Sequence, residues 1–588
     1  MSSSDVFASI SSLASSSSSS PSSQSDLYTC VFQHFSGGSS GNHGSSGSSV
    51  VSLTPPHRLG THVETFGATC VRMIMLVQDV PNPEMFVGGA SNAYRETPQN
   101  TQDPFTSWTE GAQNVIWERR PMLLVPIPNE ASWVQDDFGV MPPATPTREV
   151  DSPAAPPQTN NGANRKRPIS STTMVDSAEQ TAAPSLREQP AAPTPPPLPT
   201  AQQQQISEAG SVLAKFYPAN GAPLPKLHDV VEVIGVVTHT PADFTNMLDD
   251  PSFASASPAY PPPSQLPRLQ VLHYRTLEPV QRISRSVVEA PVQDVRSLLL
   301  ASLTSEAFAG DALAAEYMLL QLLSRVYARV GDRPLGKLSL NFTRCTEITA
   351  SSIVTCVSGL CAYAGGVRLT QLAAADAPSL VPKKDYETER LMRGALQLPA
   401  SSVLVIDETD VVEGMQFGEV GVKNLSALQA VATKASLPID FTFYETACPL
   451  DVSVISVSRG KSLLRDTFDA AVPVQPDAAA AAAAASVVSA AVAGAVDALR
   501  LAVLKARTCG DASIPASEAA ALALETAVVS HKNALAQAGV DVTQEHLHHA
   551  LTLARLLAIS YGDAEVSAAH VNRASELEVA REKRLIAA

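Results

Sequence analysis

Residues 403–408 read VLVIDE, four consecutive apolar residues followed by two acidic ones. A short, continuous apolar run is typical of a strand that is buried on both faces in a parallel sheet. In a Walker B motif such a strand delivers one acid to Mg²⁺ and a second acid to the attacking water, and Asp407 and Glu408 have this placement. An ordinary strand that ends at an acidic turn has the same sequence, so both interpretations stay open.

Helices and strands are expected to alternate around this stretch. The expected helices are at residues 295–303, 314–330, 353–362 and 385–396, and the further strands at 338–342, 367–372 and 452–457. This alternation predicts a three-layer α/β domain over residues 285–475. Residues 476–588 are predicted to form a helical domain, in which the uncharged alanine-rich run after residue 477 favours a helix or spacer over a membrane span.

The first half of the chain is predicted to be rich in strands. A serine- and glycine-rich head, residues 1–50, and a linker rich in proline and glutamine, residues 141–206, contain too few large apolar groups to be expected to fold. Between and after them, residues 51–140 and 207–284 read as β-rich segments. The strands of the second segment would either complete the first β-domain or cap the domain that follows it. The expected strands are at residues 71–77, 115–117, 122–125, 212–217, 230–237 and 269–274.

Composition narrows the class of function. The chain has 57 acidic and 41 basic residues and a net charge of −16, which argues against a protein that grips nucleic acid over its whole surface and favours a protein partner. The serine-rich start has no basic region and no continuous apolar region, so it does not read as a secretory signal and the cytosol or nucleus is expected.

Metal and disulfide chemistry are not expected. The seven cysteines include no CxxC pair, which predicts reduced, mostly buried thiols. His546, His548 and His549 cluster without a nearby cysteine or acid pair that would complete a metal site, so a solvated helical face is expected.

A phosphate-binding loop of the form GxxxxGK[ST] is absent from the sequence, and the nearest candidate is GDALAAEY, residues 310–317. This stretch resembles the phosphate loop of minichromosome maintenance (MCM) ATPases, beginning at Gly310 and Asp311. The resemblance places Glu316 where the lysine would be and Tyr317 where the Mg²⁺-binding serine would be. A carboxylate would repel a triphosphate, and a tyrosine ring would fill the space of the metal. The alternative is an ordinary helix start with Asp311 as its N-cap.

These motifs, taken together, resemble the MCM-binding protein family over most of the chain after residue 50. The matching stretches are residues 310–317, 326–327, 334–337, 384–386, 396–399, 404–409, 421–424 and 460–464. The resemblance implies a multi-domain α+β protein with an OB-like N-terminal β-domain and a degenerate AAA+-like core. It also implies a nuclear, non-enzymatic protein without cofactor or metal, which binds MCM helicase subunits, unloads them from chromatin or chaperones them, and supports sister-chromatid cohesion.

Three hypotheses about mechanism follow. In the first, the core docks on a helicase subunit through its homologous shape, with the helix at residues 314–329 and the C-terminal helices as contact surfaces. In the second, the chain is a residual ATPase that uses Asp407 and Glu408 with Lys337 or Lys461 in place of the missing lysine. In the third, the β-domains bind single-stranded DNA. The residues considered for this third function are Phe66, Arg72, Phe86, Tyr94, Arg95, Trp108, Trp117, Arg119, Arg120 and Trp133, whose aromatics serve equally well as core and turn anchors.

Overall fold

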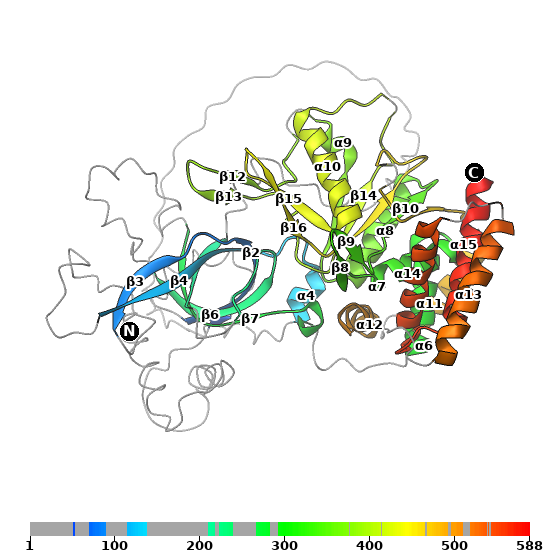
Figure 1. The fold of residues 1–588 in the computed structure, drawn as a ribbon, viewed down its shortest axis with the longest axis horizontal. Helices are drawn as coiled ribbons and strands as arrows, with labels where there is room; N and C mark the ends of the chain where they lie inside the picture. Colours follow the sequence, from blue (N-terminus) through cyan, green and yellow to red (C-terminus); the bar gives the residue numbers. More distant parts are fainter. Residues whose placement is uncertain are drawn as a thin grey trace, which may run out of the picture.

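The computed structural model describes the chain in segments: residues 51–52, 70–89, 114–137, 210–217, 223–238, 266–282, 292–374, 377–412, 414–464, 467–491, 496–509, 518–537, 539 and 543–587. The predicted head and the predicted linker lie outside these residues. The described part is a mixed α/β structure with a barrel, a parallel sheet and a group of C-terminal helices (Figure 1).

Five strands close into a barrel. Their order is β2-β6-β7-β5-β4, and β4 pairs back onto β2 to close the ring. Within this ring of five strands, the β5–β7 pairing is parallel and the other four pairings are antiparallel. The barrel strands are β2 (Cys70–Asp79), β4 (Asn114–Val125), β5 (Val212–Phe216), β6 (Val230–Thr238) and β7 (Arg268–Thr276). Both predicted β-rich segments therefore contribute strands to a single barrel.

The barrel interior is filled by alternate residues of its strands, as the two-residue period of a strand requires. Met73, Met75 and Val77 of β2 and Val231 and Val233 of β6 all belong to one buried cluster. Two short strands extend the sheet outside the ring: β1 (Val51–Ser52) pairs with β2, and β3 (Glu84–Gly89) pairs with β4.

The second unit is built on a five-stranded sheet in which every pairing is parallel. Its order is β11-β14-β17-β10-β18. The strands are β10 (Leu340–Thr343), β11 (Ala364–Arg368), β14 (Ser402–Asp407), β17 (Val452–Val457) and β18 (Ala470–Pro473). Every residue of β14 and β17 is buried, which confirms the prediction that these two apolar runs lie inside a parallel sheet.

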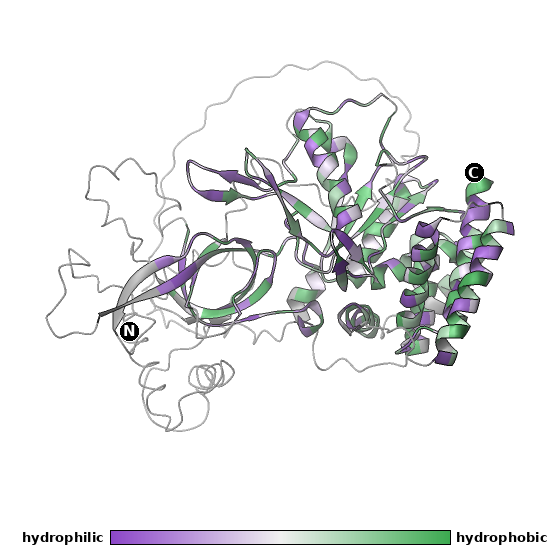
Figure 2. Cartoon of the chain, in the orientation of Figure 1, coloured by the Kyte–Doolittle hydropathy of each residue, from purple (hydrophilic) through white to green (hydrophobic). Residues whose placement is uncertain are grey.

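Both faces of the parallel sheet are covered, and Figure 2 shows its apolar strands inside the unit. On one face Val403, Val405 and Ile455 share a core with helices from both ends of the unit. On the other face Leu404 and Val454 pack with α10 (Glu419–Lys434). The helices of the first core are α6 (Val292–Ser302), α7 (Ala312–Leu323), α8 (Glu347–Leu360), α12 (Val496–Cys509), α13 (Glu518–Gln537), α14 (Gln544–Tyr561) and α15 (Ala568–Ile586).

The C-terminal helices therefore share a core with the sheet. The alanine-rich run forms α11 (Ala478–Ala491). This helix contacts α6 and the π-helical turn η4 (Leu303–Ala307), which directly follows α6 in the chain. Among the described helices none is by itself long and apolar enough to cross a membrane. One pair bent by 118°, Asp294–Ala307 with Ala312–Leu323, has the required length and composition.

The prediction of a helix at residues 385–396 is wrong. These residues form a hairpin of β12 (Lys383–Asp385) and β13 (Arg390–Met392). The Asp385 carboxylate accepts hydrogen bonds from the Glu387 amide and the Thr388 hydroxyl, which turns the chain. Glu389 then has a φ of 55°, a left-handed conformation that a helix excludes.

Two other predicted elements are shorter than expected. The predicted helix 314–330 ends with α7, because Ser324 has an extended backbone, and the chain continues into a hairpin of β8 (Ala328–Val330) and β9 (Arg333–Leu335). The predicted strand 367–372 is divided between β11 and a single turn of helix, α9 (Leu369–Leu372).

A small sheet lies beside the barrel and joins two hairpins. Its order is β13-β12-β15-β16, in which β15 (Ser436–Asp440) and β16 (Glu445–Pro449) form the second hairpin. The barrel contacts this sheet through the end of β2. The Gln78 side chain donates to the Leu391 carbonyl at 2.8 Å, and the Asp79 carboxylate accepts from the Leu391 amide at 3.0 Å.

A second contact joins the barrel region to the helices. Trp133 of α4 (Ser132–Asp137) donates its indole N–H to the Ser358 carbonyl at 3.1 Å, and the Arg500 guanidinium lies 4.4 Å from the centre of its ring. Buried Arg282 of η3 (Pro279–Arg282) pairs with Glu130 and with the Tyr363 hydroxyl.

Candidate functional site at the carboxyl edge of the parallel sheet

In an open parallel sheet, ligands bind beyond the carboxyl ends of the strands, near the point where the strand order reverses. Here that point lies between β10 and β17, because the chain continues from β10 to β11 at one edge of the sheet and from β17 to β18 at the other edge. The ends of β10, β17 and β14 place Thr343, Val457 and Asp407 along the edge. This edge is therefore the first place to look for nucleotide chemistry.

The turn that leaves the first strand of the sheet is very short. β10 ends at Thr343 and α8 begins at Glu347, so only Arg344, Cys345 and Thr346 connect them. A phosphate-binding loop lies at this strand-to-helix position, but it is longer and its glycines let the backbone amides surround the phosphates. The three residues of this turn include no glycine and cannot form such a ring of amides.

Hydrogen bonds within the protein hold the turn against the sheet and the helix. The Cys345 amide donates to the Ser458 carbonyl at 3.0 Å, which ties the turn to the end of β17. Thr346 is the N-cap of α8, and its hydroxyl accepts from the Thr349 amide at 3.3 Å. Arg344 has a φ of 62°, the left-handed conformation that non-glycine residues rarely adopt. The turn is closed onto the sheet.

Glu408, the second acid of the Walker-B-like run, is buried and its oxygens are occupied. It accepts hydrogen bonds from the Ser456 hydroxyl at 2.5 Å, the Ser462 hydroxyl at 2.7 Å and the Leu463 amide at 2.7 Å. These donors come from β17 and from the segment after it. The carboxylate holds that segment in place instead of pointing at an open site.

Asp407 is also bound to its own surroundings. One oxygen accepts from the Thr409 amide at 2.9 Å and from the Thr409 hydroxyl at 2.6 Å. The other oxygen lies 3.5 Å from the guanidinium of Arg368, at the end of the neighbouring strand β11. The structure brings Asp407 and Glu408 to the carboxyl edge, as a Walker B motif requires, and gives both of them local partners.

The stretch at residues 310–317 lies elsewhere, which corrects the expected position of the phosphate-loop counterpart. α7 follows η4 and does not follow a strand of the sheet. Gly310 has a φ of 102°, and a Cβ there would lie 1.8 Å from the Asp477 carbonyl oxygen, so glycine is needed for contact with the start of α11. The strand-to-helix position belongs to the turn after Thr343, which the sequence did not reveal because it has neither glycine nor lysine.

Asp311 is the N-cap of α7, as the alternative interpretation predicted. One carboxylate oxygen accepts from the Leu313 and Ala314 amides at 3.0 and 3.2 Å. The other oxygen accepts from the Gln475 amide at 2.7 Å and from Arg584 of α15 at 2.6 Å. The capping residue therefore also anchors the last helix.

Glu316 and Tyr317 point into the helical core. Glu316 pairs with Arg296 of α6 at 2.8 Å and with Arg573 of α15 at 2.6 Å. Tyr317 is fully buried, and its hydroxyl donates to Glu578 of α15. Burial and the adjacent Glu578 carboxylate raise the pKa of Tyr317 well above its ordinary value.

The burial of α7 changes one of the mechanistic hypotheses. Every residue of the helix from Ala314 to Leu323 is buried, so this helix cannot be a contact surface for a partner. A surface that docks on another protein must be provided by other elements.

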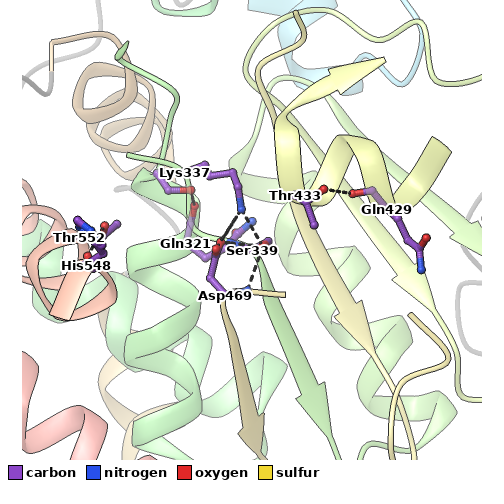
Figure 3. Close-up of polar contacts among 9 residues, drawn as sticks. Gln321, Lys337, Ser339, Gln429, Thr433, Asp469, His548 and Thr552 are labelled. Atoms are coloured by element: carbon purple, nitrogen blue, oxygen red, sulfur yellow. Dashed lines mark hydrogen bonds and ion pairs between the residues drawn. The ribbon is translucent and has the colours of Figure 1, made fainter. Parts of the chain in front are cut away.

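The two lysines considered as substitutes occupy different edges of the sheet. Lys337 precedes β10, so it lies toward the amino edge, opposite Asp407, and its ammonium is 2.8 Å from Asp469. Figure 3 shows Lys337 and Asp469 pointing toward each other. They line a cavity of about 890 Å³ that also includes His548 and Thr552 of α14. Lys461 is exposed and follows β17 at the carboxyl edge, beside Ser462.

The histidine cluster is not a uniformly solvated face, which corrects that expectation for His549. His549 lies 3.2 Å from Glu578 with its side chain only 10% exposed. His546 caps α14 through the Thr543 amide, and His548 is exposed. Within the described residues no group of three or more histidine, cysteine or acidic side chains could hold a metal ion.

The described part of the barrel offers little for nucleic acid. Trp133 is used in the contact with Arg500. Arg72, Arg119 and Arg120 each form an ion pair with a glutamate, namely Glu232, Glu84 and Glu118 respectively. The other candidates lie outside the described residues or side chains, namely Phe66, Phe86, Tyr94, Arg95, Trp108 and Trp117.

Comparison with known proteins gives the family. The mini-chromosome maintenance complex-binding protein of Salmo salar is 30% identical, over 87% of this chain and 88% of the relative. The protein of the same name from Arabidopsis thaliana is 28% identical, over 88% of each chain. A crystal structure of a full-length MCM homolog from Methanopyrus kandleri is 16% identical, with a TM-score of 0.40 over 64% of this chain and 72% of that one, too low to establish a shared fold. The family model described as mini-chromosome maintenance replisome factor matches residues 66–585, so the chain belongs to that family.

Proposed function

We propose that this chain is a non-catalytic factor that binds the MCM complex in DNA replication. The named relatives are MCM complex-binding proteins, and the alignment with them extends over most of both chains. The observation that carries the non-catalytic part is the three-residue turn between β10 and α8, whose Cys345 amide is bonded to the Ser458 carbonyl.

The energetics of the carboxyl edge support the absence of ATP hydrolysis. Mg²⁺ or water coordination by Glu408 would require it to give up hydrogen bonds from two hydroxyls and one amide. Each hydrogen bond to a charged group contributes about 1.5 to 3 kcal/mol, and no ring of amides is present at the turn to compensate with phosphate contacts. A nucleotide would therefore meet a site that is already filled by the protein.

The topology supports a relation to the ATPase fold without its chemistry. Numbered along the chain, the parallel strands have the order 5-1-4-3-2 from β18 to β11, which is the order of AAA+ cores. The closed five-stranded barrel agrees with an OB-like domain. We assign the chain an OB-like barrel and a degenerate AAA+-like core that acts through its shape.

The cellular role follows from the family alone. We propose that the chain acts in the nucleus and associates with chromatin through MCM subunits. We also propose that it unloads or chaperones those subunits and thereby supports sister-chromatid cohesion.

Two measurements on the full chain test the proposal. Titration calorimetry with ATP and Mg²⁺ is expected to give no binding heat, and purified MCM subunits are expected to bind. Mg²⁺-dependent ATP binding that is lost in both Asp407→Ala and Lys461→Ala would instead overturn the empty-site claim and favour a residual ATPase, the second candidate, which the position of Lys461 at the carboxyl edge supports. Failure of every MCM subunit to bind would refute the proposed partner.

A further inference from the structure

The two hairpins of the small sheet end together in a group of exposed aromatic rings. β12 runs parallel to β15, with Lys383 paired to Asp440, so the turns that follow both strands lie at the same end of the sheet. Tyr386 follows β12 and is 51% exposed, while Phe443 and Tyr444 precede β16 and are 83% and 59% exposed. We call these residues, with Phe441, the aromatic tip.

The rings of the aromatic tip contact one another, and a hydrogen bond joins its two turns. The Tyr386 and Phe443 rings have centres 5.8 Å apart, and Phe441 and Tyr444 are stacked with centres 4.9 Å apart. The Tyr386 hydroxyl donates to the Phe441 carbonyl at 2.9 Å, which joins one hairpin turn to the other. Rigid, exposed aromatic side chains lose little conformational entropy when they enter a pocket, and they dominate the binding energy of many protein interfaces.

The charge around the aromatic tip distinguishes between classes of partner. The two turns and the adjoining strand residues carry five acidic side chains, Asp385, Glu387, Glu389, Asp440 and Glu445, and three basic ones, Lys383, Lys384 and Arg390. Single-stranded nucleic acid binds where stacking aromatics line a positively charged groove. An acidic setting opposes that arrangement and complements a protein surface that carries lysine or arginine.

We propose that the aromatic tip is a docking surface for a folded protein that presents an apolar pocket with a basic rim. This proposal rests on the proposed function, since the partner we assign to the surface is a subunit of the MCM complex. It replaces the contact surface once expected on α7, which is buried.

The experiment measures binding of the full chain to the purified MCM complex by biolayer interferometry. The double variant Phe443→Ser with Tyr444→Ser is expected to weaken binding at least tenfold. Val330→Ser is the matched control, because Val330 is 67% exposed and belongs to another hairpin, β8–β9. Because these side chains are exposed, the variants are expected to keep the fold. Circular dichroism and thermal unfolding of each variant check this expectation.

Two further measurements, one on a charge-reversal variant and one with an oligonucleotide, test the proposed docking surface. The double charge reversal Glu387→Lys with Glu445→Lys is expected to weaken binding at low salt. Binding that both double variants leave unchanged would overturn the docking surface, while absence of binding by the unmodified chain would overturn the proposed function as well. Tight binding of a labelled single-stranded oligonucleotide that Phe443→Ser with Tyr444→Ser abolishes would assign the aromatic tip to nucleic acid and refute the proposal.

Discussion

The carboxylate of Glu316 and the guanidinium of Arg573 are joined at 2.6 Å across 257 residues of chain. Glu316 also pairs with Arg296, so one acidic side chain links α6, α7 and α15. This carboxylate has a structural role: it fixes the first helices of the α/β unit to the last helix of the protein.

Replacing Glu316 by alanine is expected to destabilise the fold. The loss should be about 2 to 3 kcal/mol, below the usual cost of breaking a buried pair because Arg573 is partly exposed. Urea unfolding followed by circular dichroism measures it. Glu576→Ala is the control, because Glu576 pairs with the same Arg573 at an exposed position and should cost under about 1 kcal/mol.

Restoring a lysine at the position of Glu316 is expected to give no nucleotide binding. Glu316→Lys would place a third cation beside Arg296 and Arg573 and would unfold the protein at lower urea concentration. Calorimetric titration with ATP and Mg²⁺ checks the first expectation. A gain of ATP affinity in this variant would contradict the placement of the strand-to-helix turn at Arg344, Cys345 and Thr346.

Glu408→Ala is expected to destabilise the fold by roughly 3 kcal/mol or more, because two hydroxyls and one amide would lose their buried acceptor. Asp410, two residues further along the chain, is the matched control, since it is partly exposed and lies 3.9 Å from Arg368. Asp410→Ala should change the unfolding free energy by less than about 0.5 kcal/mol. Equal effects of the two substitutions would show that the Glu408 network does not stabilise the edge.

The buried histidine His228 should make stability depend on pH. Burial lowers the pKa of His228 from 6.5 to about 4, so the unfolded chain takes up a proton before the folded one does. The contribution of neutral, buried His228 to the free energy of unfolding is therefore fully present above pH 6.5 and is lost as the pH falls toward 4. His228→Asn keeps the φ of 70°, which asparagine tolerates, and removes the titration.

The measurement is the unfolding free energy at several pH values between 7 and 4. The wild-type chain should lose stability more steeply than His228→Asn over this range. Parallel curves for wild type and His228→Asn would contradict the burial effect.

Thiol reactivity should separate the described cysteines. Burial is the main cause that raises the pKa of Cys345 and Cys356 to about 12 and that of Cys361 to about 11. These thiols stay protonated at pH 8, so iodoacetamide should modify partly exposed Cys448 first, although burial also raises its pKa. Peptide mapping by mass spectrometry determines the order in which the cysteines are modified. Modification of Cys361 at the same rate as Cys448 would contradict it.

Two central strands of the parallel sheet were the most predictable part of the fold. β14 and β17 are continuous apolar runs because both faces of a parallel sheet are covered, and that pattern is visible in the sequence. The hairpin at residues 383–392 was not predicted, because its Glu and Arg residues suit an exposed helix and the turn depends on local hydrogen bonds of Asp385.

The candidate site was predictable only in part. Asp407 and Glu408 were found because a strand end followed by acids is a sequence signal. The turn at Arg344, Cys345 and Thr346 was not found, because it contains none of the glycines and no lysine by which phosphate-binding turns are recognised. The partners of Glu316 lie on α6 and α15 and could not be identified without the packing of those helices.

The closure of the barrel has a consequence for synthesis of the chain. β2 and β4 emerge from the ribosome early, but their neighbours β6 and β5 belong to residues 212–238, and β7 ends only at Thr276. Pairing between segments so distant in sequence is slow, because a long loop must close before any contact forms. Until Thr238 has been made, the edge of β2 that will pair with β6 has no partner, and the ring stays open until Thr276 has been made. A nascent chain of this length is therefore a natural client for chaperones.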